Sequence, residues 1–322
     1  MKSFGMAVIG LGVVGRRMLE QAQISRGVRV VSAWDLSAGV RQQAATDFPG
    51  LPMAQSAADA IERLDVDVVY VAVPPLAHAD YVRAAVAAGK AVFCEKPLGV
   101  DLADSRALVD DVARSGVAQA VNFVFASSEA VDALARAVRD PAFGLRAVEI
   151  RTQFQVWPRA WQAGATWLQR SDQGGFTREV LSHFIYLLYR VLGPLTHHGA
   201  CAAGPSPELA ETALAASLSC GGVPVSIMGA VGGQPPDLIE ARFVGSTQAL
   251  HLSDWYRLEA FGPQCPAGQR VPGLPDDPRQ ATYQRQLDQL HAMLNGEPHS
   301  LPSFADALAV QTHIETLLSS RI

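Results

Sequence analysis

The sequence of 322 residues lacks the features that mark several large classes of protein. It has no uninterrupted apolar stretch long enough to cross a bilayer, so we expect no membrane partner. Lysine and arginine form no cluster and the formal net charge is −5, so we expect no nucleic-acid partner. No histidine, cysteine or carboxylate spacing suits a metal, and we expect no metal site.

Cysteine is scarce, and no pair forms a C-x-x-C motif. The four cysteines are Cys94, Cys201, Cys220 and Cys265. Scattered thiols of this kind are typical of proteins from a reducing compartment, so we expect a cytoplasmic location. Nor does the apolar run after Met1 indicate a secretory signal, because glycines interrupt it and no small-residue cleavage site follows. We interpret that run as the first strand of the fold.

The composition is that of a globular protein long enough for two domains. Apolar residues make up 49% of the chain and charged residues 18%. There is no internal repeat and no low-complexity linker. We place the domain boundary so that 1–123 form the first domain and 124–322 the second, which is expected to bind substrate. We expect the final helix to pack back on the first domain.

The run from Met6 to Gly15 reads as a buried strand, a G-x-G-x-x-G turn and the start of a helix. In such a turn Gly10 allows the sharp bend, Gly12 allows the backbone to approach a pyrophosphate, and Gly15 allows close helix–strand packing. Val13 and Val14 complete the turn. The N–H groups at the helix start then face the negative charge of the ligand.

Asp35 ends the next predicted strand, Val28–Asp35, 20 residues after Gly15. This is the spacing of the acidic residue that binds the ribose hydroxyls of a dinucleotide. A carboxylate there repels the 2′-phosphate of NADP. The motif therefore predicts NAD as the cofactor, with NADP as a possible second one.

Strand and helix patterns alternate through the first domain, which predicts a parallel sheet covered by helices, a Rossmann-type domain. The further segments are strands at Asp65–Val73, Ala91–Cys94 and Val117–Phe123 and helices at Val40–Phe48, Ala77–Ala88 and Asp101–Ser115.

Successive strands in the second domain predict an α+β fold with a large, mostly antiparallel, open sheet. The expected strands are Leu145–Phe154, Leu195–Ala202, Ala213–Cys220, Val223–Val231, Ile239–Val244, Gln248–Leu252 and Arg257–Phe261; the expected helices are Ser127–Arg139, Thr177–Val191, Ala281–Asn295 and Phe304–Ser319, after a proline-rich loop at Pro263–Pro278. Apolar residues occur on both faces of this sheet. We therefore expect a homodimer or homotetramer assembled through it.

Four segments together resemble the glucose–fructose oxidoreductase, inositol dehydrogenase and rhizopine-catabolism (Gfo/Idh/MocA) family. They are the turn Gly10–Gly15, the segment Pro74–His78, the tripeptide Glu95-Lys96-Pro97, and Gly174-Gly175 followed by His183. Glu179 stands where the family usually has aspartate. The resemblance covers essentially the whole chain. It implies an NAD(P)-dependent dehydrogenase or reductase that acts on a small hydroxyl or keto compound.

The resemblance and the residue chemistry together indicate the groups that move protons. Lys96 follows a buried strand, where ligands of open parallel sheets bind, and its ammonium can stabilise a developing negative charge. Glu179 and His183 are four apart on a predicted helix and share a face. A carboxylate beside an imidazole raises the imidazole pKa and orients the ring, which suits His183 as a general acid or base.

Other residues of these segments have open roles. Pro74 and Lys96 belong to the expected cofactor site. Glu95 either pairs with a cofactor hydroxyl or holds Lys96. His78 either contacts a ribose or is a solvated residue of a first helical turn. Arg178 is expected to be solvated.

An aromatic loop precedes the helix that carries His183. Its residues Trp157, Arg159 and Trp161 suit a planar or anionic substrate. The alternative is that the tryptophans pack the loop onto the core or an interface.

Two other functions fit the same sequence. One is a non-catalytic dinucleotide-binding sensor or regulator that keeps the glycine turn. The other is a reductase of imines. Retention of both Lys96 and His183 favours an enzyme.

Overall fold

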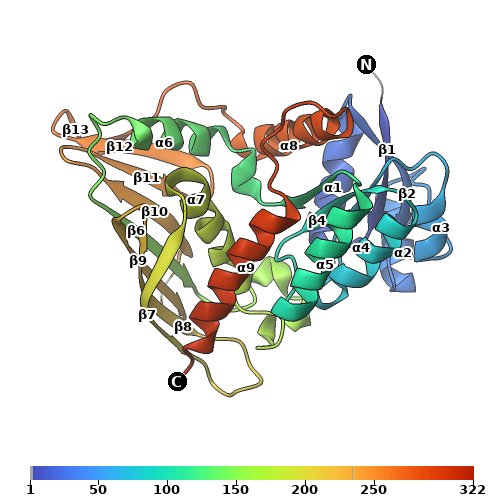
Figure 1. Ribbon diagram of the computed structural model, residues 1–322, viewed down its shortest axis with the longest axis horizontal. Helices are drawn as coiled ribbons and strands as arrows, with labels where there is room; N and C mark the ends of the chain where they lie inside the picture. Colours follow the sequence, from blue (N-terminus) through green and yellow to red (C-terminus); the bar gives the residue numbers. More distant parts are fainter. Residues whose placement is uncertain (1–2, 234) are drawn as a thin grey trace. The chain divides into compact units, whose positions relative to one another are not determined.

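A computed structural model describes residues 3–233 and 235–322 of the chain (Figure 1). Contacts divide it into two compact units. The first comprises Met1–Ser127 and Thr282–Ala309, and the second Ser128–Ala281 and Val310–Ile322. The first unit is therefore discontinuous in sequence, because a segment from the C-terminal part of the chain joins the N-terminal residues.

A five-stranded parallel sheet lies at the centre of the first unit, in the order β2-β1-β3-β4-β5. The strands are β1 (Phe4–Ile9), β2 (Val28–Trp34), β3 (Val68–Val71), β4 (Ala91–Glu95) and β5 (Gln119–Asn122). The chain order reverses at β1, which has β2 on one side and β3 on the other. In open α/β sheets ligands bind outside the carboxyl ends of the strands at such a switch point. The predicted Rossmann-type fold is confirmed.

Helices connect these strands. They are α1 (Val13–Ile24), α2 (Ala38–Asp47), α3 (Ala57–Glu62), η1 (Pro75–Ala77), α4 (His78–Ala87), α5 (Leu102–Ser115) and η2 (Val124–Ala126). Helix α3 was not expected from the sequence. It has a single apolar pair on its buried side, Ala60 and Ile61, and begins with the Ser56 hydroxyl accepting the N–H of Asp59.

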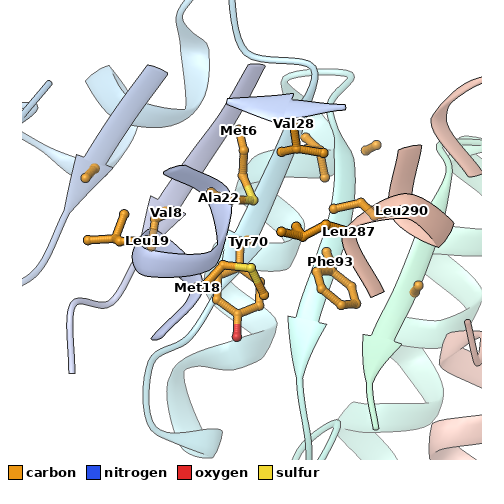
Figure 2. Close-up of a cluster of buried hydrophobic side chains, with 14 of the residues drawn as sticks. Met6, Val8, Met18, Leu19, Ala22, Val28, Tyr70, Phe93, Leu287 and Leu290 are labelled. Carbon is orange, nitrogen blue, oxygen red and sulfur yellow. The ribbon is translucent and has the colours of Figure 1, made fainter. Parts of the chain in front are cut away.

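Part of the first unit's core comes from the C-terminal region. Leu287 and Leu290 of α8 (Pro278–Leu294) are fully buried against Met6, Tyr70 and Phe93 of the sheet, as Figure 2 shows. Burying a leucine side chain contributes about 1.5–3 kcal/mol, so α8 stabilises the sheet that it covers. The sequence predicted this helix as Ala281–Asn295 but did not identify its partner.

An eight-stranded sheet forms the second unit, in the order β13-β12-β11-β10-β6-β9-β8-β7. Its strands are β6 (Ala147–Phe154), β7 (Leu195–Ala203), β8 (Ala213–Cys220), β9 (Val223–Val231), β10 (Leu238–Val244), β11 (Ala249–Ser253), β12 (Arg257–Gly262) and β13 (Cys265–Arg270). All neighbours are antiparallel except β6 and β9. The predicted α+β fold with a mostly antiparallel sheet is confirmed.

The sheet has one buried and one exposed face, because burial alternates along β6 and β9. The helical segments of this unit are α6 (Glu129–Arg139), η3 (Ala160–Gln162), η4 (Thr166–Gln169), η5 (Thr177–Leu181), α7 (Ser182–Leu192) and the second half of α9 (Phe304–Ser319). The exposed face carries a groove of about 710 Å³ whose lining includes Glu149, Arg151 and Met228.

Two expectations were wrong. The proline-rich loop Pro263–Pro278 contains strand β13, which pairs with β12 at the edge of the sheet. Pro266 is compatible with a strand there, because an edge strand needs only half of its backbone donors. The predicted strand Asp65–Val73 is shorter than expected and comprises only Val68–Val71. Among the described residues, no helix is long and apolar enough to cross a membrane.

Candidate active site

The glycine turn follows β1 at the switch point of the parallel sheet. Gly10 has φ +97°, a left-handed conformation that side chains disfavour, and its N–H donates to the Trp34 carbonyl (2.8 Å). A Cβ on Gly15 would overlap the Gly10 carbonyl oxygen. A Cβ on Gly12, by contrast, would meet no protein atom within 4 Å. Two glycines are therefore required by the fold, and Gly12 borders open space at the start of α1.

Asp35 joins the loops after β1 and β2. Its Oδ2 accepts the Leu11 N–H (2.8 Å) and its Oδ1 accepts the Ser37 N–H (2.8 Å). The Arg41 guanidinium donates to the backbone carbonyl of Asp35 (2.6 Å). The carboxylate is thus fixed beside the glycine turn, as a ribose-binding acid requires.

His78 holds the segments that follow β3 and β4 together. The ring is 1% exposed, with Nε2 2.9 Å from the Val73 carbonyl oxygen and Nδ1 2.9 Å from that of Pro97. The expectation of a solvated first-turn residue is wrong. Burial lowers the pKa of His78 to about 4, so the ring is neutral and donates to one carbonyl at a time. A ribose contact stays a prediction, as does the cofactor role of Pro74, which precedes η1.

We expect His78 to make the protein less stable in acid. In the unfolded state His78 has the ordinary imidazole pKa of about 6.5. In the folded state its pKa is about 4, so between these pH values only the unfolded state binds the proton. Stability is therefore full above pH 6.5 and declines as the pH falls to 4. In His78→Gln the slope of unfolding free energy against pH should be lower by up to about 1.36 kcal/mol per pH unit in this window. Urea unfolding at several pH values measures both slopes, and equal slopes would contradict the assignment.

Glu95 lies in a buried polar network at the carboxyl ends of three strands. It accepts hydrogen bonds from the Tyr70 hydroxyl of β3 and from Nδ2 of Asn122 of β5 (2.6 Å). Asn122 in turn accepts from Gln286 of α8. Burial and the adjacent carboxylate raise the pKa of Tyr70 well above its usual value, so the phenol stays a donor. The network fixes the end of β4, and the half-buried Lys96 follows directly.

In the second unit, Gly174 and Gly175 lead into the helix that carries Glu179. Gly175 has φ +93°, and a Cβ there would overlap the Glu211 carboxylate. Glu211 is 2% exposed and accepts the Thr177 N–H (2.7 Å) at the start of that helix. Burial raises the pKa of Glu211. No sequence pattern marks Glu211, although it explains why glycine is needed at 175.

The first turn of the predicted helix differs from the expected α-helix. Thr177–Leu181 form a π-helix (η5), and α7 begins at Ser182. Such π-turns occur often at functional sites, because the widened turn changes where side chains project. Glu179 lies in the π-turn and His183 follows it. The sequence periodicity alone cannot distinguish the two helix types over five residues.

Arg178 is buried, so the expectation of a solvated arginine is wrong. Its Nε and Nη2 donate to the two Glu315 carboxylate oxygens of α9 (2.7 Å each). Its Nη1 donates to the carbonyls of Ser171 (2.7 Å) and Gly174 (3.1 Å). The paired arginine therefore ties the glycine pair and the π-turn to α9.

Glu179 contacts the aromatic loop. Its Oε1 accepts from Nε2 of Gln162 (3.0 Å) and lies 3.9 Å from Nη2 of Arg159. Arg159 also donates from Nε to Oε1 of Gln162 (2.8 Å). The structure thus brings together Glu179 and one predicted substrate residue, through a glutamine that the sequence did not single out.

Aromatic rings surround the Arg159 guanidinium. Its central carbon lies 4.6 Å from the ring centre of Trp161, 5.6 Å from that of Phe154 and 5.7 Å from that of Trp157. Trp157 also donates from Nε1 to the Leu168 carbonyl (2.9 Å), whereas Trp161 is 44% exposed. Trp157 thus packs the loop, and the more exposed Trp161 is the better candidate for contact with a ligand.

His183 is buried near the start of α7, with 5% of its surface exposed. The Trp255 ring lies edge to face against it, 5.1 Å between ring centres. Trp255 was not predicted, and no motif includes it. Among the described residues, no group of three or more histidine, cysteine or acidic side chains is arranged to bind a metal.

Comparison with known proteins gives a family match within the first unit. Residues 4–123 match the GFO_IDH_MocA family, described as an oxidoreductase family with an NAD-binding Rossmann fold. The Rossmann domain of this chain belongs to the Gfo/Idh/MocA oxidoreductase family. The family match, the glycine turn after β1 and Asp35 after β2 agree, so this is an NAD-binding Rossmann domain.

Two individual relatives of this Gfo/Idh/MocA domain are similar to part of the chain. An inositol 2-dehydrogenase of Klebsiella pneumoniae is 36% identical over 117 residues, 35% of this chain and 34% of that protein. A D-apiose dehydrogenase of Paraburkholderia graminis is 30% identical over 175 residues, 53% and 45% of the two chains. The aligned region thus spans less than half of either relative.

The fold is shared over nearly the whole chain. The structure of a 3-ketoreductase from Actinomadura kijaniata, in complex with NADP and TDP-benzene, superposes with a TM-score of 0.83. It covers 99% of this chain and 98% of that one at 21% identity. Both units therefore have the architecture of this enzyme.

Proposed function

We propose that the protein is an NAD(P)-dependent oxidoreductase that transfers a hydride between nicotinamide and a small hydroxyl or keto substrate, a sugar, a polyol or a related compound. One observation carries the proposal: Lys96 follows β4 at the carboxyl edge of the sheet that also bears the glycine turn and Asp35. The polyol and sugar substrates in the names of the two dehydrogenases support the substrate class.

The residues present fit a dinucleotide. The open space beside Gly12, at the start of the twelve-residue helix α1, suits a pyrophosphate, and the fixed Asp35 carboxylate suits two ribose hydroxyls. Asp35 favours NAD. Arg41, which donates to the carbonyl of Asp35, is the nearest cation for the 2′-phosphate of NADP.

The bound nicotinamide supplies hydride transfer, and the protein moves the proton. In the oxidising direction the substrate hydroxyl would give its proton to the protein. We assign Lys96 and His183 to this proton transfer and to orientation of the substrate oxygen. Glu179, Trp157, Arg159 and Trp161 form the proposed substrate-binding group of the second unit.

The exposed face of the eight-stranded sheet supports the proposal of a homodimer or homotetramer. Met228 is 55% exposed in a strand whose other face is buried, and it lines the groove described above. We also propose a cytoplasmic location, which the four free thiols support.

A substrate panel tests the function. The purified protein is incubated with NAD or NADP and a series of polyols and sugars, and with imines in the presence of the reduced cofactors, while absorbance of the reduced cofactor is followed. We expect turnover of a polyol or sugar with NAD. Turnover only of imines would identify an imine reductase. Tight cofactor binding without turnover of any compound would favour a dinucleotide-binding sensor or regulator.

Gly12→Val should abolish cofactor binding without disturbing the fold. The added Cβ enters open space, where it meets no protein atom within 4 Å, and the side chain fills the place proposed for the pyrophosphate. We expect a loss of NADH affinity of at least tenfold by fluorescence titration, with an unchanged melting temperature in the absence of cofactor. Unchanged affinity would remove the pyrophosphate from this turn.

A further inference from the structure

Two adjacent residues of the second unit have an unusual backbone conformation. Asp254 has φ +47° and Trp255 has φ +71°, and among the described residues they are the non-glycine residues with positive φ. Aspartate tolerates the left-handed region because its short side chain bonds locally. A bulky tryptophan there is an outlier, and such outliers persist where the surrounding structure requires them.

The outlier lies at the tip of a hairpin. Ser253 ends β11 and pairs with Arg257, which begins β12, so residues 254–256 make the connection. The Asp254 N–H donates to the Ile239 carbonyl of β10 (3.1 Å), which anchors the tip to the next strand. Glycine is the common residue for positive φ in such tips, because it lacks a Cβ. A turn alone does not account for tryptophan at this position.

The contacts of the indole offer a reason. Its ring meets His183 edge to face at 90° and 5.1 Å between centres, and Phe184 at 6.1 Å. Both partners are on α7 and are buried, whereas Trp255 is half-buried. The left-handed backbone therefore directs a large rigid ring onto the imidazole to which the proposed function assigns proton transfer.

We propose that Trp255 is a positioning residue for His183: the strained hairpin tip holds the indole so that the imidazole keeps one orientation. The proposal rests on the proposed function only for its catalytic consequence. Proton transfer depends steeply on geometry, and a displacement of about 1 Å can cost about a hundredfold in rate. A ring with two rotatable bonds that packs edge to face against the imidazole restricts the orientations open to it.

Three variants separate the ring from the backbone. Trp255→Gly removes the indole and leaves a residue that favours positive φ. Trp255→Phe keeps an aromatic ring. Asp254→Gly is the matched control, because it relaxes the neighbouring residue and leaves the indole in place. Crystal structures of the three proteins show the His183 side chain, and steady-state kinetics with NAD and the best substrate of the panel give kcat and KM.

In Trp255→Gly we expect His183 to occupy a new or a second rotamer and kcat to fall about ten- to hundredfold, with KM for NAD within twofold. Trp255→Phe and Asp254→Gly should keep the wild-type rotamer and stay within about threefold of the wild-type kcat. An unmoved His183 in Trp255→Gly would overturn the proposal. A rise in substrate KM with unchanged kcat would also overturn it, because Trp255 would then bind substrate directly.

One result would separate this proposal from the proposed function. If His183 moves in Trp255→Gly while kcat is unchanged, and His183→Ala is equally active, Trp255 positions the ring but His183 does not carry the proton. That outcome supports the positioning role and contradicts the acid–base assignment of His183. If Trp255→Gly does not fold, Trp255→Phe decides, since a moved His183 beside an intact phenylalanine ring would overturn the proposal.

Discussion

Lys96→Ala should lower kcat by about 10²- to 10⁴-fold, the usual contribution of a placed acid, base or charge-stabilising group. The Tyr70–Glu95–Asn122 network fixes the end of β4, so Lys96 begins from a defined backbone position. Affinity for NADH should stay near the wild-type value, because the glycine turn and Asp35 hold the rest of the cofactor. Single-turnover hydride transfer with an identified substrate measures the effect.

Lys90→Ala is the matched control for this prediction. Lys90 directly precedes β4, and its ammonium donates to the carbonyls of Arg63 and Val66 (2.9 Å each). Its removal deletes the same charge at the opposite end of the same strand. We expect an unchanged kcat in Lys90→Ala. Equal losses in both lysine variants would indicate a general loss of folded protein, and no loss in Lys96→Ala would remove Lys96 from the chemistry.

Glu315→Leu should be among the most destabilising single changes in the second unit. It leaves the Arg178 guanidinium, which is 7% exposed, without the carboxylate that binds it through two hydrogen bonds. Removing one partner of a buried ion pair typically costs about 3–5 kcal/mol. Chemical denaturation should show this loss as a lower midpoint, and because Arg178 also binds the Gly174 carbonyl, the π-turn should loosen with it.

An exposed pair provides the comparison. Arg170 and Asp172 also form an ion pair (2.8 Å), but about half of each side chain is exposed to solvent. Asp172→Leu should therefore shift the denaturation midpoint far less than Glu315→Leu. A double variant that also changes Arg178→Met should recover part of the loss, because the uncompensated buried charge is gone. No recovery would mean that packing, rather than charge, causes the loss.

The sequence predicted most of the fold because the relevant signals are local. The Val-rich strands and the glycine turn identify the parallel sheet and its ligand-binding edge within short windows. Strand β13 was not predictable in this way. Its segment, Cys265–Arg270, contains proline and glycine, which are unfavourable in strands, and only its backbone pairing with β12 defines it as an edge strand.

The candidate site was predictable where a motif carried it. The positions of Gly10, Gly12, Gly15 and Asp35 around the turn follow from spacing. Arg178 was misjudged because its partner, Glu315, lies 137 residues away in sequence. The role of Glu211 was also not predicted, because its partner Thr177 lies 34 residues away in sequence. Trp255 was not predicted because bulky residues rarely adopt a positive φ. Long-range contacts and backbone strain leave no trace in a single sequence.

The discontinuity of the first unit has a consequence for how the chain is made. The ribosome releases β1 to β5 first, whereas Leu287 and Leu290, which pack against Met6 and Phe93 of the sheet, emerge only after Ser128–Ala281. Until then a nascent chain exposes apolar surface on its nucleotide-binding sheet. The first unit therefore completes its core only after Ser128–Ala281 of the second unit have been synthesised.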